Sequence, residues 1–187
     1  MPQIELDHAT LEDLYHVDGK AELVGGRIIR MMATGFLPGR IAGGIFFSLE
    51  TFAEQTKLGY ALGDNIGYAV KPLHSGRESF SPDVSFYSGK LHANLIRFIE
   101  GPPTFAVEIR SENDYGTQAE FEMAAKRADY FEAGTLVVWD VDTLGKCVHS
   151  YKASAPYLKE TFSSGQHAHA EPAVPGWRID VDRIFTI

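Results

Sequence analysis

The order of apolar and polar residues predicts a chain of alternating helices and strands. Apolar residues recur at a helical spacing over residues 38–58 and again over residues 117–133, and Gly134 is typical of a helix C-terminus. Residues 105–110 alternate with the period of a strand. Residues 136–139 are apolar without interruption, which is typical of a central strand buried on both faces. These four segments are the main elements of the predicted fold.

Shorter patterns add smaller elements around these segments. The predicted elements are a helix at residues 8–17 capped by Thr10, a hairpin at residues 22–29 with a Gly-Gly turn, a strand at residues 59–70 interrupted by a bulge or hairpin, a helical turn at residues 95–99, an edge hairpin at residues 148–162 and a last strand at residues 177–181.

Two acids lie on predicted strands. Asp83 follows Pro82 at the start of a short strand, where proline is tolerated because it has no N–H to donate. Glu108 and Arg110 share one face of the strand at residues 105–110, because side chains alternate at period two. Burial of such a pair is costly unless the two groups satisfy each other or hold an ion.

The helix at residues 117–133 is apolar on two sides. One stripe, expected to face the core, consists of Phe121, Ala124, Ala125, Ala128 and Phe131. The opposite stripe contains Met123, Lys126 and Tyr130, which would cover the stem of the lysine and direct its ammonium group. The alternative is an ordinary surface lysine. A helix of this kind is typical of an element sandwiched under a loop or at a subunit contact.

Composition limits the class of protein. The 187 residues predict a single domain over residues 1–187, and one cysteine fits a reducing cytoplasm. No apolar run is long enough to span a membrane, so no membrane contact is expected. The net charge of −8 opposes avid nonspecific binding to DNA. A nuclease with this charge needs a cleft that is locally positive or carries a metal ion.

Several residues allow an ordinary interpretation beside a functional one. Glu22 precedes the Gly-Gly turn and by itself reads as a solvated acid at a strand end. Arg40 lies in the first turn of a helix and is either an exposed side chain or a phosphate contact. Cys147 is interpreted as a packing residue rather than a nucleophile. His167 and His169 lack a third ligand in sequence and are weak candidates for a metal site.

The order of several short motifs resembles the Uma2 family of bacterial proteins. The resemblance covers nearly the whole chain, and it implies the PD-(D/E)xK restriction-endonuclease-like fold. That fold is α/β, with a central mixed β-sheet flanked by helices in the order α-β-β-β-α-β, here with an N-terminal hairpin. The motifs are AELVGGRIIRM at 21–31, Ser-Pro-Asp at 81–83, VEIRS at 107–111, a helical Lys126, VVWD at 137–140 and VPGWRIDVDRIF at 174–185.

The resemblance implies a metal-dependent endonuclease site. Asp83 and Glu108 would hold Mg²⁺ or Mn²⁺, with carboxylates about 4–6 Å apart given the lengths of metal–oxygen bonds. Glu22 would be a further acid of the site. Arg110 stands where the superfamily pattern has lysine, so Lys126 would supply the ammonium group. The expected substrate is nucleic acid, with DNA preferred.

The expected roles follow from charge. Lys126 would have a lowered pKa and orient or activate water, whereas Arg110 and Arg40 would bind phosphate. Loss of Lys126 should therefore abolish cleavage, and loss of Arg110 should weaken substrate binding more than turnover. Two other classes stay open: a catalytically silent nuclease fold that binds nucleic acid or regulates, and an assembly module in which the acid and Arg110 form a buried ion pair.

A homodimer is also expected. The two-sided helix at residues 117–133 and the Gly43-Gly44 pair in the long helix both suit close contact with another chain.

Overall fold

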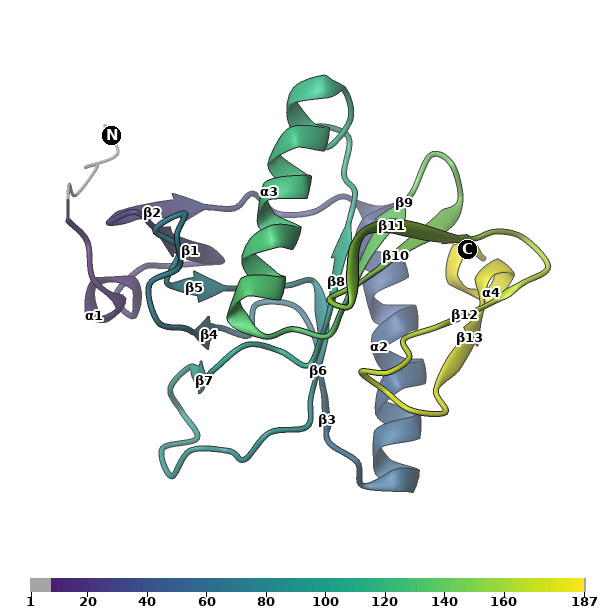
Figure 1. The fold of residues 1–187 in the computed structure, drawn as a ribbon, viewed down its shortest axis with the longest axis horizontal. Helices are drawn as coiled ribbons and strands as arrows, with labels where there is room; N and C mark the ends of the chain where they lie inside the picture. The colour runs from purple at the N-terminus through teal and green to yellow at the C-terminus, as the bar shows by residue number, and fades with distance from the viewer. Residues whose placement is uncertain (1–7, 187) are drawn as a thin grey trace.

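Helices α2 (Phe36–Thr56) and α3 (Thr117–Ala133) lie on opposite faces of a six-stranded sheet (Figure 1). The structure is a computed structural model that describes residues 8–186. Strands β8 and β9 run parallel and the other neighbours are antiparallel, so the sheet is mixed. Its spatial order is β11 (Ala155–Phe162), β10 (Cys147–Lys152), β9 (Val137–Asp142), β8 (Phe105–Ile109), β6 (Val84–Tyr87) and β3 (Tyr60–Leu62).

The predicted fold class is confirmed. Along the chain, α2, β3, β6, β8, α3 and β9 follow one another in the expected α-β-β-β-α-β order. Smaller elements surround this core, and they are α1 (Leu11–Leu14), β1 (Ala21–Val24), β2 (Arg27–Arg30), β4 (Tyr68–Ala69), β5 (Ser79–Phe80), β7 (Ile99–Glu100), β12 (His167–His169), β13 (Arg178–Asp180) and α4 (Val181–Phe185).

Helix α2 packs through the stripe predicted from its sequence. Lys57 ends the helix because its backbone adopts a left-handed conformation, with φ 57°. Each buried aliphatic side chain contributes about 1.5–3 kcal/mol relative to an exposed one. The buried stripe of the helix consists of Ile41, Ile45, Leu49 and Ala53. It shares a core with Phe105, Val107, Trp139 and Val141 of the sheet.

Helix α3 has the predicted bounds but turns the other stripe inward. Gly134 follows the helix with φ 113°, and its N–H donates to the carbonyl groups of residues 130 and 131. Tyr130 is fully buried and stacks on Phe80, with ring centroids 4.1 Å apart. Phe121 is 70% exposed, and the alanines of its stripe are exposed too. Of the predicted core-facing stripe only Phe131 packs against the core, and the rest of the stripe is wrong, because ion pairs beneath the helix determine which face it buries.

The N-terminal hairpin of β1 and β2 forms as predicted. Gly25 and Gly26 both have positive φ, at 57° and 72°, as a tight two-residue hairpin turn requires. The turn packs against Gly76, where an added Cβ would lie 2.9 Å from the Cα of Gly25. Leu23 completes the contact, because its carbonyl accepts from the N–H of Glu78 at 2.9 Å. The hairpin is thereby attached to the chain just before β6.

Two of the predicted short elements are wrong. Residues 59–70 form neither a bulged strand nor a hairpin, because β3 pairs in the six-stranded sheet and β4 in a separate sheet with β5 and β7. Residues 95–99 are not helical, and Ile99 instead begins β7, which pairs parallel to β4. In both cases the pairing partner comes from a distant part of the chain, which local periodicity does not report.

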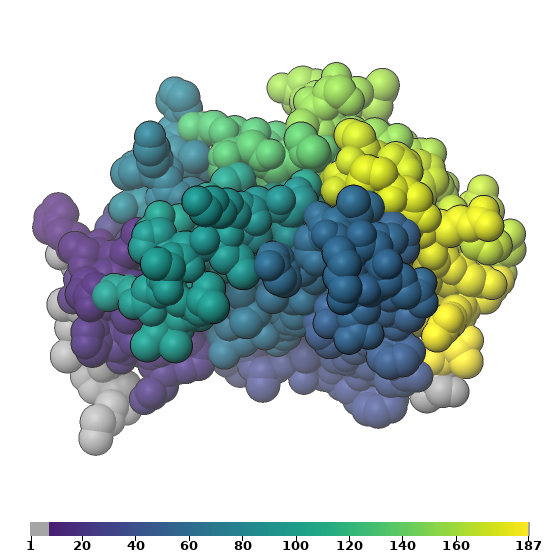
Figure 2. All heavy atoms as spheres, turned by 90° about the horizontal axis from the view of Figure 1, so that it is seen from below, coloured from purple at the N-terminus to yellow at the C-terminus, as the bar shows by residue number. Residues whose placement is uncertain are grey.

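The molecule is elongated, with its N-terminal and C-terminal parts towards opposite ends of the long axis. Figure 2 shows this from below, with purple residues at one end and yellow residues at the other. None of the helices among residues 8–186 combines the length and apolar character needed to cross a membrane.

Candidate functional site

Asp83 lies directly before strand β6, and Glu108 lies on the neighbouring strand β8. The register pairs Val84 with Val107, which sets Asp83 beside Glu108 where β6 and β8 adjoin. Asp83 is held by the next strand, since its N–H donates to the Val107 carbonyl at 3.1 Å and its Oδ2 accepts from the N–H of Ile109 at 2.8 Å. Both carboxylates are partly exposed, with side chains 24% and 21% accessible.

Glu108 receives two donors from helix α3. Its Oε1 accepts from the hydroxyl of Tyr130 at 2.6 Å and lies 2.9 Å from Nζ of Lys126. Its Oε2 has no hydrogen-bond partner within the described part of the chain. Burial raises the pKa of Glu108, and although Lys126 opposes this effect, the charges of Asp83 and Glu22 add to it.

Glu22 belongs to the same cluster and is not a solvated strand-end acid. Its residue is only 2% exposed, because β1 is docked against the segment leading into β6. Oε1 accepts from the N–H of Ser81 at 2.9 Å and lies 3.0 Å from Nζ of Lys126, whereas Oε2 binds the guanidinium of Arg77. Burial alone would raise the pKa of Glu22, but the attraction of Lys126 and Arg77 outweighs it, so the pKa is lowered.

Lys126 joins two of the predicted acids. Its ammonium lies between Glu22 and Glu108, and the interpretation as an ordinary surface lysine is wrong. Burial disfavours the charged form, but the attraction of Glu108 and Glu22 outweighs this effect and raises the pKa of Lys126. The expectation of a lowered pKa is therefore wrong for this state of the protein. Lys126 is a cation and a hydrogen-bond donor here, not a base.

Lys20 is a residue of the cluster that the sequence reasoning missed. Its Nζ lies 2.7 Å from Oδ1 of Asp83 and 2.7 Å from Oδ1 of Asp64. Burial works against its charge, yet Asp83 and the hydrogen bonds raise the pKa of Lys20. The available signal was its spacing, since Lys20 precedes Glu22 by two residues, as side chains on one face of a strand do.

Arg77 and Asp129 form a second layer beneath Glu22. The Nε of Arg77 donates to Oδ2 of Asp129 at 2.9 Å, and Asp129 lies on α3 next to Tyr130. This ion pair ties the segment before β6 to the helix that carries Lys126. Arg77 lies in a loop that the sequence marks only as polar, so no local pattern indicated its role.

A pocket opens beside Asp83. Its volume is about 260 Å³, and it lies between the first half of α2 and the ends of the strands. Its lining residues are Thr34, Pro38, Gly39, Ala42, Gly43, Phe46, Gly63, Asp64, Asp83 and Ile109. Gly43 contributes open space, because an added Cβ would meet nothing within 4 Å.

Arg110 does not pair with Glu108. Its Nε and Nη2 donate to the two oxygens of Asp140 at 2.8 and 2.7 Å, and it also binds Glu120. The ion pair of Glu108 and Arg110, which the alternative as an assembly module required, does not form. Arg110 instead pairs with Asp140 on β9 and with Glu120 on α3. Arg40, the other predicted phosphate contact, is exposed and makes no ion pair among residues 8–186.

The donor set at Asp83 and Glu108 fits a hard divalent cation. Both residues offer carboxylate oxygens, the ligands that Mg²⁺ and Mn²⁺ prefer, and both are partly accessible. The ammonium groups of Lys20 and Lys126 each occupy one oxygen of these acids. An incoming cation would compete with the two lysines, and Oε2 of Glu108 is the oxygen that it would find unengaged by the described residues.

Comparisons with known proteins agree with this architecture. The sequence model of the Uma2 family, described as "Putative restriction endonuclease", matches residues 8–182. No curated protein matches the chain. The structure is similar to the crystal structure of a "putative nuclease belonging to DUF820" from Anabaena variabilis, with a TM-score of 0.73 and 16% identity. The similarity covers 94% of this chain and 97% of that chain, and at this identity it shows the fold alone.

Proposed function

Because this protein belongs to the Uma2 family, we propose that it is a metal-dependent endonuclease that hydrolyses phosphodiester bonds in nucleic acid, with DNA as the substrate. The observation that carries the proposal is the position of Lys126, whose ammonium group bridges Glu22 and Glu108. Asp83 lies directly before the adjacent strand and lines a pocket. Two neighbouring acids, one of which lines a pocket, and a lysine beside them are the groups that metal-assisted phosphodiester hydrolysis needs.

The proposed cofactor is Mg²⁺ or Mn²⁺, held by Asp83 and Glu108. When bound, such a cation neutralises developing negative charge on the phosphate and lowers the pKa of a bound water. Glu22 keeps Lys126 in place, since its buried carboxylate lies 3.0 Å from the ammonium group. Tyr130 orients Glu108 through its hydroxyl group.

Lys126 acts in this scheme as a fixed positive charge. Its raised pKa keeps it protonated at neutral pH, so it donates hydrogen bonds to a phosphate oxygen or to the attacking water. With a cation held by Asp83 and Glu108, the ammonium group of Lys126 would be available to the substrate. Proton removal from the water falls to the solvent or the substrate phosphate rather than to Lys126.

The first experiment is cleavage of supercoiled plasmid DNA with Mn²⁺ or Mg²⁺. We expect the wild type to nick the plasmid and Glu108→Gln to lose this activity, because the amide is a poor ligand for a hard cation. Glu100→Gln is the matched control, since Glu100 lies on β7 with its side chain 70% exposed. Chelation of the metal should stop the wild type. Equal cleavage by wild type and Glu108→Gln would contradict the proposal.

A catalytically silent protein that binds nucleic acid is the second candidate. The observation in its favour is that Lys20 and Lys126 form ion pairs with Asp83 and Glu108, so residues of the chain itself balance the charges of both acids. A wild type that binds DNA or RNA, but neither cuts them nor binds Mn²⁺ at Glu108, would favour this candidate.

The homodimer and a cytoplasmic location are also proposals. Phe121 and the neighbouring alanines of α3 form an exposed apolar stripe, which supports a contact with a second copy. Gly43 gives less support to a dimer contact, because this residue borders the pocket. Sedimentation at micromolar concentration tests the dimer, and a monomer would remove it.

A further inference from the structure

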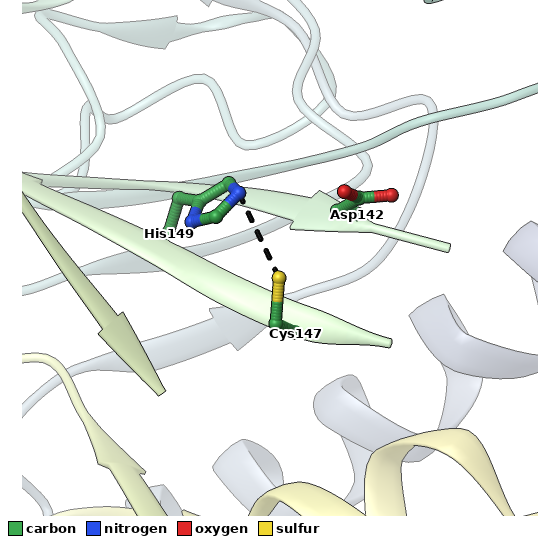
Figure 3. A group of neighbouring side chains, drawn as sticks. All are labelled: Asp142, Cys147 and His149. Carbon is green, nitrogen blue, oxygen red and sulfur yellow. Dashed lines mark hydrogen bonds between the residues drawn. The ribbon is translucent and has the colours of Figure 1, made fainter. Parts of the chain in front are cut away.

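A second group of potential metal ligands lies at the far end of β9 and the start of β10. Asp142 and Cys147 are register partners in the antiparallel pair, and His149 follows two residues later on the same face (Figure 3). One ligand atom from each residue lies within 4.8 Å of the others. Within residues 8–186, this is the one group of three or more His, Cys, Asp or Glu residues with that property.

We propose that Asp142, Cys147 and His149 form a binding site for a thiophilic divalent cation, with Zn²⁺ as the expected ion. The site is separate from the proposed nuclease centre, because it shares no residue with it. Three protein ligands leave a fourth position of a tetrahedral ion for water. A mixed set of sulfur, nitrogen and oxygen donors suits Zn²⁺, whereas Mg²⁺ prefers oxygen alone.

The distance between the sulfur of Cys147 and the ring nitrogen of His149 matches the distance expected for two atoms bound to one ion. Sγ of Cys147 lies 3.7 Å from Nε2 of His149. In a tetrahedral site with bonds of about 2.3 Å to sulfur and about 2.0–2.1 Å to nitrogen, these atoms are about 3.6 Å apart. Little movement is therefore needed for the two side chains to bind one cation, and Asp142 borders the same space.

Neighbouring groups orient the imidazole ring as a metal ligand. Nδ1 of His149 lies 2.9 Å from Oγ1 of Thr161 on β11. With its proton on Nδ1, the ring donates to this hydroxyl and leaves a lone pair on Nε2, which faces Cys147. Hydrogen bonds of this kind to the second ring nitrogen hold metal-binding histidines in position.

The carboxylate of Asp142 is also held in place. Its Oδ1 accepts from the hydroxyl of Tyr115 at 2.9 Å and from the N–H groups of Leu144 and Gly145 at 3.1 and 2.8 Å. Its Oδ2 accepts no hydrogen bond from the described residues. Gly145 leaves room for this oxygen, because an added Cβ would lie 2.5 Å from it.

A catalytic cysteine fits the same residues less well. A thiolate–imidazolium pair needs a lowered thiol pKa and an oriented, protonated imidazole. Burial instead raises the pKa of Cys147, and burial lowers the pKa of His149. The thiolate is the form that binds a thiophilic cation, so binding would displace the thiol proton. With one cysteine in the chain, an internal disulfide is excluded as well.

The test is titration of the purified full-length chain with Co²⁺, which replaces Zn²⁺ and gives a thiolate-to-cobalt absorption band. Because Cys147 is the only cysteine, any such band reports this residue. We expect one Co²⁺ per chain, displacement by Zn²⁺, and loss of the band in Cys147→Ser. His149→Gln should weaken binding at least tenfold. Thermal unfolding should shift upward with Zn²⁺, since ligands that bind the folded state stabilise it.

Two further variants test whether the three ligands must keep their geometry and whether the cation binds away from the proposed nuclease centre. Gly145→Ala keeps all three ligands but forces Oδ2 of Asp142 to move, and we expect about 10–100-fold weaker binding. Glu108→Gln should leave the band unchanged, because it alters only the proposed nuclease centre. Absence of the band, a band that survives His149→Gln and Gly145→Ala, or one Co²⁺ shared by two chains would each overturn the proposal.

Discussion

The Nζ atom of Lys126 on α3 lies 2.9 Å from Oε1 of Glu108 on β8. The residue immediately after this acid on the same strand, Ile109, donates its N–H to Asp83. A helical cation is therefore placed against one acid while the strand itself holds the other acid. Arg110, two residues after Glu108, points to other partners. The chemistry proposed for the site therefore depends on Lys126 of the helix, and not on Arg110, as the cation beside Glu108.

Replacement of Lys126 by methionine should lower turnover about 10²–10³-fold, the usual loss when a fixed donor to a developing charge is removed. The same variant should bind Mn²⁺ more tightly, because the ammonium group no longer competes for Glu108. Rapid-quench cleavage and isothermal titration measure the two effects. Lys71→Met, at an exposed position outside the cluster, is the control. Wild-type turnover in Lys126→Met would remove the assigned role.

Replacement of Arg110 by alanine should cost stability before it costs substrate binding. Its side chain is 6% exposed and binds Asp140, whose carboxylate is 1% exposed. A buried acid left without its partner costs about 3–5 kcal/mol, here reduced by Arg127 at 3.5 Å. Urea unfolding measures this loss. If stability is unchanged but the Kd for DNA rises, Arg110 binds phosphate as its place in the sequence first suggested.

Replacement of Tyr130 by phenylalanine should move the pH dependence of cleavage. The tyrosine hydroxyl donates to Glu108 at 2.6 Å and so lowers the pKa of that carboxyl, against the raising effect of burial. Without this donor the pKa rises further, and the ionised form needed for metal binding is lost at a higher pH. We expect the acidic limb of the pH–rate profile to shift upward by about one pH unit. Tyr60→Phe, half-exposed on β3, should leave the profile unchanged.

Replacement of Glu22 by glutamine should destabilise the protein in a pH-dependent way. The folded-state pKa of Glu22 is lowered, so its contribution is present above the ordinary value of 4.5 and is lost as pH falls through the lower folded value. At neutral pH the loss should be about 3–5 kcal/mol, because Arg77 and Lys126 lose a buried partner. Denaturant unfolding of both proteins from pH 7 to pH 3 measures the difference. A difference that stays constant over this range would contradict the assignment.

Replacement of Gly43 by leucine should block the pocket without harming the fold. The added side chain enters the space beside Asp83, while the helix gains up to about 1 kcal/mol in propensity. We expect a higher KM for DNA together with an equal or higher melting temperature. Gly44→Leu is the matched control, since Gly44 does not line the pocket and an added Cβ meets Arg40 at an ordinary 3.6 Å. Equal effects of the two variants on KM would show that the pocket does not take substrate.

The local pattern of apolar and polar residues was enough to predict the helix and the strand that carry the site. The bounds of α3 and its cap at Gly134 follow from helical spacing and one glycine, and the alternation of Phe105, Val107 and Ile109 follows from strand period. The position of Asp83 beside Glu108 also follows, once β6 and β8 are known to be neighbours. The first two features depend on residues close together in the chain, where periodicity and turn chemistry act, whereas the pairing of β6 with β8 is a long-range contact.

The partners of the charged residues were decided only by the tertiary structure. The sequence placed Lys126 on a face of α3 opposite the one expected to be buried, and it left Glu22 in solvent. Folding instead brings Glu22 and Glu108 beneath the helix, so the face with the ammonium group is turned inward and the apolar stripe with Phe121 stays outside. The cost of burying an unpaired charge exceeds the gain from burying a few alanines, and such pairings join strands and helices that only chain closure brings together.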